Sequence, residues 1–145
     1  MIKSKDCLIA GGVISALISL LHVVLALKPE LYRYIVPGQE SALAQMAEQG
    51  ASLTTLASAA LALIFAVWAL YAFSGAGLIG PLPGLRAILI ATGVIYILRA
   101  LFLPSEINMV LTQGYPFRFV AFSTLSLMTG MLYLIGIRKQ RAALT

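Results

Sequence analysis

The side chains best suited to chemistry in this sequence are one arginine, one histidine and a few glutamates. Arg99 lies near the end of an almost unbroken apolar run, Ala87–Leu103, which Pro104 follows. An ionisable residue inside an apolar segment of membrane length costs about 2.5 kcal/mol or more, so Arg99 needs a partner, a hydrated cavity or a route to the membrane surface. His22 is the only histidine and lies near the end of another apolar run.

Three interpretations of Arg99 and His22 follow from their chemistry. In the first, Arg99 is structural and reaches the lipid headgroups or pairs with a loop glutamate as a clasp. In the second, Arg99 and His22 hold the anionic or polar head of a ligand whose tail lies between helices, such as a lipid, a quinone or a lipid-linked intermediate. In the third, His22 acts as an acid or base beside a loop glutamate.

The composition indicates the elements that carry these residues. The chain has 145 residues, of which 61% are hydrophobic and 10% are charged, whereas about a quarter of the residues in soluble domains are charged. Four apolar runs approach the length of about 20 residues that crosses a bilayer. Runs of this length in lipid must be helices, because only a helix satisfies its own backbone. The sequence predicts an all-α polytopic membrane protein, a single domain of four transmembrane helices in an up-down bundle, with spans at about 7–27, 53–73, 85–103 and 117–137.

The distribution of Lys and Arg predicts the orientation of the bundle, because cytoplasmic loops carry the excess of basic residues. With a cytoplasmic N-terminus, six basic residues lie inside against three or four outside, so we expect both termini in the cytoplasm. The inner set is Lys3, Lys5, Arg86, Arg138, Lys139 and Arg141; the outer set is Lys28, Arg33 and Arg118, with Arg99 close by.

The connections between the predicted spans contain three further features. Gln39–Gln49, between the first two spans, reads as a short helix on the outer membrane surface or over the bundle. Ser105 is predicted to cap a two-turn helix that ends near Gly114. Gly75–Gly80 spells GxGxxG, but a membrane helix precedes it, so we interpret it as a helix C-cap and a stiff turn.

Laying the four spans side by side predicts a polar layer at their outer end. His22 and Arg99 lie five and four residues before the ends of two parallel spans, which at 1.5 Å per residue is about 6–8 Å below the outer boundary. The other two spans bring serines to a similar depth, and we expect the glutamates of the outer loops to lie above this layer. The candidate ligand-binding residues are therefore His22, Arg99, Tyr96, Ser58, Ser123, Glu40, Glu48 and Glu106.

The residue content of the chain argues against several classes of function. The single Cys7 excludes an internal disulfide, a CxxC redox pair and a thiolate metal cluster, and a bis-histidine haem would need two chains. We therefore expect no metal and no cofactor. No acidic residue lies inside a span, which argues against proton-coupled antiport, and topology explains the basic residues better than nucleic-acid binding does.

Three stretches carry a resemblance to a known group of proteins: Trp68–Ile79, Leu82–Arg86 and Tyr96–Arg99. Together with the layout of the spans they resemble small four-helix bacterial inner-membrane proteins of the DoxX type. The resemblance implies a multi-pass protein of the bacterial inner membrane. No established activity comes with it, so no catalytic role is transferred.

The sequence thus predicts a non-catalytic membrane protein that binds an amphipathic ligand, lipid- or quinone-like, or a partner membrane protein through the outer polar layer. Helix faces rich in small residues allow tight packing and self-association into a homo-oligomer. The alternative is a small membrane enzyme that acts on a lipid-like substrate with His22 as acid/base.

Overall fold

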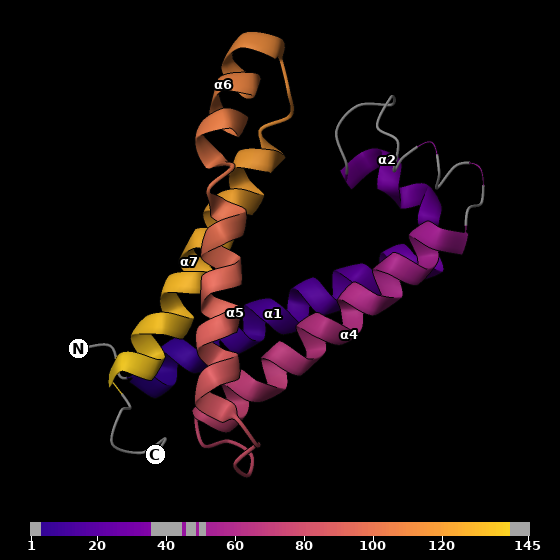
Figure 1. Ribbon diagram of the computed structural model, residues 1–145. Helices are drawn as coiled ribbons and strands as arrows, with labels where there is room; N and C mark the ends of the chain where they lie inside the picture. Colours follow the sequence, from indigo (N-terminus) through magenta and orange to yellow (C-terminus); the bar gives the residue numbers. More distant parts are fainter. Residues whose placement is uncertain (1–3, 36–44, 46–48, 50–51, 140–145) are drawn as a thin grey trace. The chain divides into compact units, whose positions relative to one another are not determined.

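The computed structural model describes residues 4–35, 45, 49 and 52–139, and no strand occurs within these ranges. Of the predicted helix over 39–49 only Gln45 and Gln49 are described, and the candidate residues Glu40 and Glu48 lie outside the described residues. The helices, drawn in Figure 1, are α1 (Ser4–Leu27), the short 3-10 helix η1 (Pro29–Leu31), α2 (Tyr32–Ile35), α4 (Ser52–Gly75), α5 (Leu85–Ala100), α6 (Leu103–Gln113) and α7 (Arg118–Lys139).

Within the described residues, four helical segments are long and apolar enough to cross a membrane, as the sequence predicted. They are Ser4–Leu27, Ser52–Gly75, Leu85–Gln113 and Arg118–Arg138. Each exposes large apolar side chains, for example Leu17, Leu63, Leu98 and Met128, which a membrane protein turns toward lipid. The four segments indicate a multi-pass membrane protein.

The chain forms two compact units, which are described separately. The first unit contains the described residues up to Ser15 and those from Trp68 onward, and the second unit contains Ala16–Val67. The first unit thus holds one end of α1, one end of α4, and the whole of α5, α6 and α7.

Small residues allow close helix contacts within the first unit. A Cβ atom on Gly130 of α7 would lie 2.7 Å from Cγ1 of Ile97 and 2.8 Å from the carbonyl oxygen of Gly93, both on α5. A Cβ atom on Gly11 of α1 would lie 2.8 Å from the ring of Tyr133 on α7. Van der Waals packing of small residues is a main source of helix association in lipid, and Gly11 and Gly130 lie at such close helix contacts.

The α5 and α6 helices are two parts of one bent segment. Leu101 and Phe102, between them, keep right-handed helical dihedral angles, and Figure 1 shows α6 continuing beyond the end of α5, with α7 alongside. The break arises because Pro104 has no N–H to give to the carbonyl four residues earlier. The 29 residues of Leu85–Gln113 extend about 43 Å at 1.5 Å per residue, longer than a hydrocarbon core of about 30 Å.

The predicted cap of α6 was wrong at its start and correct at its end. The helix begins at Leu103, and the N-cap position is Phe102, without a side-chain cap. The hydroxyl of Ser105 instead donates to the carbonyl oxygen of Phe102 at 2.8 Å, because the preceding backbone is already helical and needs no cap. The helix ends at Gln113, and its C-cap is Gly114, whose φ of +67° is left-handed.

The glycine-rich motif after α4 is a helix C-cap, as predicted. Gly77 has a φ of +75°, its N–H bonds to the carbonyl of Ser74, and the N–H of Leu78 bonds to the carbonyl of Phe73. This pair of bonds is the Schellman motif. The Ser74 hydroxyl then donates to the carbonyl of Gly80 at 2.8 Å and stiffens the turn.

Candidate functional site

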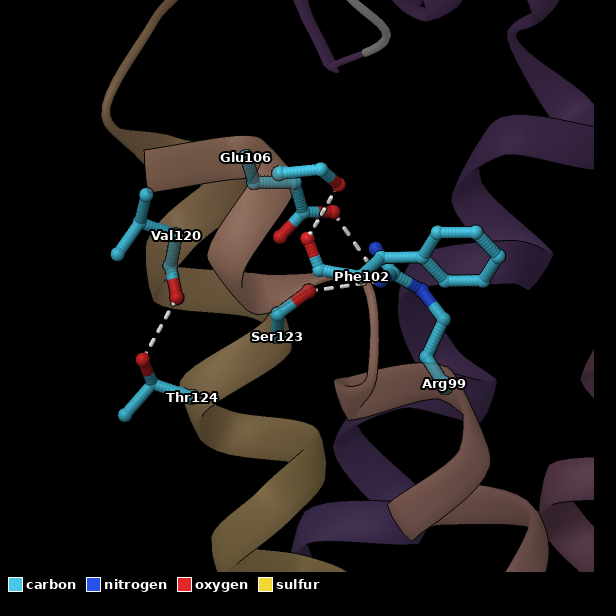
Figure 2. A network of polar contacts seen from close by, with 7 residues as sticks. Arg99, Phe102, Glu106, Val120, Ser123 and Thr124 are labelled. Carbon is cyan, nitrogen blue, oxygen red and sulfur yellow. Dashed lines mark hydrogen bonds and ion pairs between the residues drawn. The ribbon is translucent and has the colours of Figure 1, made fainter. Parts of the chain in front are cut away.

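Arg99 lies at the centre of a charged cluster in the first unit. Its Nη1 atom donates to Oε1 of Glu106 at 3.2 Å and to Oγ of Ser123 at 2.7 Å. Figure 2 shows the guanidinium reaching from α5 toward Glu106 of α6 and Ser123 of α7. Of the two structural roles expected for Arg99, the structure shows the clasp with a loop glutamate. The neighbouring Thr124 does not take part, since its hydroxyl donates to the carbonyl of Val120.

One edge of the Arg99 guanidinium remains open. A guanidinium has five N–H groups, and Nη1 uses its two on Glu106 and Ser123. The Nε–H and Nη2 groups have no hydrogen-bond partner in the part of the chain that the structure describes. These two nitrogens form the edge that binds both oxygens of a carboxylate or phosphate with parallel bonds. The side chain of Arg99 is 42% exposed, compared with 13% for Glu106, so the guanidinium is accessible and this edge is not used by the described residues.

Exposed apolar side chains neighbour Arg99 in the sequence, on α5 and in the bend that follows it. Leu98, Leu101 and Phe102 are 54%, 68% and 61% exposed. The ring of Phe102 also lies 6.0 Å from Cζ of Arg99, within range of a cation–π contact. A cationic fork among exposed apolar side chains fits an amphipathic molecule, with its anionic head at Arg99 and its chains along α5.

A second polar network joins all four long helices inside the first unit. Ser15 of α1 hydrogen-bonds through Oγ to the hydroxyls of Tyr96 on α5 and Tyr133 on α7, both at 2.9 Å. Tyr133 in turn donates to the carbonyl oxygen of Trp68 on α4 at 3.1 Å. Because each hydroxyl has one proton, the direction is fixed: Tyr96 donates to Ser15, Ser15 to Tyr133, and Tyr133 to Trp68. We call these four residues the hydroxyl chain.

The hydroxyl chain is a packing feature that the sequence did not reveal as a site. Ser15 and Tyr133 are fully buried, and Tyr96 is 4% exposed. The ring of Tyr96 contacts the rings of Trp68 and Tyr133, at centroid distances of 5.4 and 5.9 Å. Tyr96, expected beside Arg99, thus belongs to a different network of contacts. The sequence signal that could have indicated the hydroxyl chain is the position of Ser15 and Tyr133 on helix faces rich in small residues.

The second unit holds His22 and Ser58, each with its own partner. Nδ1 of His22 lies 2.9 Å from the carbonyl oxygen of Ile18, and because a carbonyl oxygen only accepts, Nδ1 is the donor of this bond. The ring packs against Phe65, at a centroid distance of 5.2 Å. Ser58 donates to the carbonyl of Thr54 at 2.9 Å and accepts the hydroxyl of Tyr32.

The predicted polar layer is thus divided between the two units. The structure brings Arg99, Ser123 and Glu106 together in the first unit, whereas His22 and Ser58 belong to the second. The layer across all four spans stays a prediction. Among the described residues, no group of three or more His, Cys, Asp or Glu side chains is placed to hold a metal ion.

Comparison with known proteins identified no relative of this chain. No protein-family model, no curated protein and no solved structure matches the chain.

Proposed function

We propose that this protein is a multi-pass protein of the bacterial inner membrane that binds the anionic head of an amphipathic ligand at Arg99. The four spans form an up-down bundle with both termini in the cytoplasm, and α6 extends from the outer end of α5. The Lys and Arg distribution of the sequence supports this orientation. The protein acts as a binding protein rather than an enzyme, since the described contacts of His22 are with a backbone carbonyl and an aromatic ring.

The observation that carries the proposal is the open Nε–Nη2 edge of Arg99. The two bonds from Nη1 hold the guanidinium in place, so a ligand meets a fork that is already oriented and loses less entropy on binding. A fork of parallel donors matches a headgroup with two anionic oxygens. This favours a phosphate- or carboxylate-bearing lipid over a quinone, whose carbonyl oxygens are neutral and lie apart.

Native mass spectrometry of the purified protein tests this proposal. A charge-assisted hydrogen bond contributes about 1.5–3 kcal/mol, so Arg99→Ala is expected to retain about tenfold less phospholipid than the wild type. Arg99→Lys keeps the charge without the fork and is expected to retain an intermediate amount.

Two further variants separate the ligand from the clasp. Arg138→Ala is the control, because it removes an exposed cation from the last turn of α7 and is expected to keep the bound lipid. Ser123→Ala removes one of the two bonds that orient the guanidinium but leaves the open edge, so it is expected to lose less lipid than Arg99→Ala. Equal lipid retention in Arg99→Ala and the wild type would contradict the proposal.

A further inference from the structure

We propose that the headgroup bound at Arg99 is zwitterionic, an aminoethyl phosphate such as that of phosphatidylethanolamine. The phosphate binds the open edge of Arg99, and the ammonium group binds Glu106. The inference rests on the proposed function of Arg99 and adds the chemical class of the ligand.

The first step is the charge of the site. Arg99 and Glu106 form an ion pair at 3.2 Å, and the other described partner of Arg99, Ser123, is neutral. The pair has no net charge. A purely anionic headgroup that gains the two hydrogen bonds of the guanidinium therefore also meets the repulsion of the adjacent carboxylate. A headgroup with both signs of charge meets a partner for each.

The second step is the unused acceptor of Glu106. Its Oε1 accepts from Arg99, whereas Oε2 is buried and has no hydrogen-bond partner in the described part of the chain. A buried acceptor without a donor is destabilising, and more so when it is charged. The Glu106 side chain is 13% exposed and the terminal torsion of a glutamate is broad, so a small rotation about this torsion lets a bound headgroup reach Oε2. The described residues provide no hydrogen-bond donor to Oε2, and an ammonium group supplies up to three.

The third step is the span of the headgroup. Phosphate and ammonium are joined by a two-carbon linker, so the two charges of one headgroup lie close together, as the two charges of the Arg99–Glu106 pair do. The exposed side chains of Leu98, Leu101 and Phe102 beside Arg99 receive the acyl chains. A choline headgroup has the same charges but no N–H, so it cannot satisfy the acceptor.

The experiment is a lipid titration followed by native mass spectrometry, with phosphatidylethanolamine, phosphatidylcholine and phosphatidylglycerol of identical acyl chains. The wild type is expected to bind the ethanolamine lipid about tenfold more tightly than the choline lipid, the value of one charge-assisted hydrogen bond of about 1.5 kcal/mol. Glu106→Gln is expected to reduce this preference to about twofold and to strengthen binding of the anionic glycerol lipid, because the opposing charge is removed. Glu30→Gln, the same change at an exposed glutamate of η1, should leave both preferences unchanged.

The outcomes separate this inference from the proposed function. If no lipid binds in an Arg99-dependent way, the proposed function itself fails. If binding depends on Arg99 but the ethanolamine and choline lipids bind equally, or if Glu106→Gln keeps the full preference, the zwitterionic ligand is overturned and the anionic site stands. Unchanged fluorescence of Trp68, the only tryptophan of the chain, confirms that each variant is folded.

Discussion

Replacing Gly130 with alanine is expected to lower the free energy of unfolding by about 1–3 kcal/mol, the usual cost of overpacking a tight contact. The added Cβ would lie 2.7 Å from Cγ1 of Ile97, 2.8 Å from the carbonyl oxygen of Gly93 and 3.1 Å from the backbone nitrogen of Ile97. Two of these three neighbours are backbone atoms of α5. They cannot move without separating α5 from α7, so one methyl group has a large effect.

Unfolding in sodium dodecyl sulfate, followed by circular dichroism, measures this loss of stability. Gly80→Ala is the matched control, because a Cβ at Gly80 would meet nothing within 4 Å. That variant is expected to stay within about 0.5 kcal/mol of the wild type. If Gly130→Ala unfolds at the same detergent fraction as the control, the close contact of α5 and α7 is contradicted.

Tyr133→Phe is expected to lower the free energy of unfolding by about 1–2 kcal/mol, near the upper end of values for polar contacts between membrane helices. The change removes the acceptor of the Ser15 hydroxyl and the donor to the carbonyl of Trp68. Both groups are then left in an apolar interior where no solvent replaces the lost bonds. The same unfolding assay applies, and the emission of Trp68 is expected to shift because its environment includes the hydroxyl chain.

Two further variants test whether the hydroxyls act as one chain. Tyr71→Phe is the control, because its hydroxyl donates to the carbonyl of Pro83 in an exposed bond, and its loss is expected to cost less than about 0.5 kcal/mol. Ser15→Ala removes the middle of the chain, so its effect should not add to that of Tyr133→Phe. Additive losses would show that the hydroxyls stabilise the fold independently. A Tyr133→Phe variant as stable as the control would show that the hydroxyl chain does not stabilise the fold.

The four membrane-length helices could be predicted because their cause is local. Any apolar run of about 20 residues in lipid must satisfy its own backbone, so the expected spans differ from the observed helices mainly by a few residues at their ends. The C-cap at Gly77 was equally predictable, since a left-handed turn favours glycine. The largest difference between prediction and structure lies at Pro104. A loop was expected to begin there, whereas the helix bends and continues as α6. Proline predicts an interruption of the helix, but the sequence alone does not determine whether the helix continues after it.

The contacts of the site were less predictable because they depend on the rotation of each helix. Arg99 and Ser123 were expected at the same depth, and they are hydrogen-bonded. Tyr96 is only three residues before Arg99, yet it bonds to Ser15. Depth along a helix follows from counting residues, whereas the choice between adjacent faces depends on tertiary packing. The open edge of Arg99 could not be predicted at all, because it depends on which nitrogen Glu106 and Ser123 engage.

The most direct test of the account is a distance measurement between nitrogen and phosphorus by solid-state NMR. The protein is labelled with ¹⁵N-arginine, reconstituted into phospholipid bilayers, and the Arg99 signals are assigned by their loss in Arg99→Lys. We predict that ³¹P dephases Nε and one Nη of Arg99 strongly, because both donate to phosphate oxygens over hydrogen bonds of about 2.8 Å. The guanidinium of Arg138 is the internal comparison. Arg99 nitrogens that show no stronger contact with phosphorus than those of Arg138 would contradict the lipid-binding role.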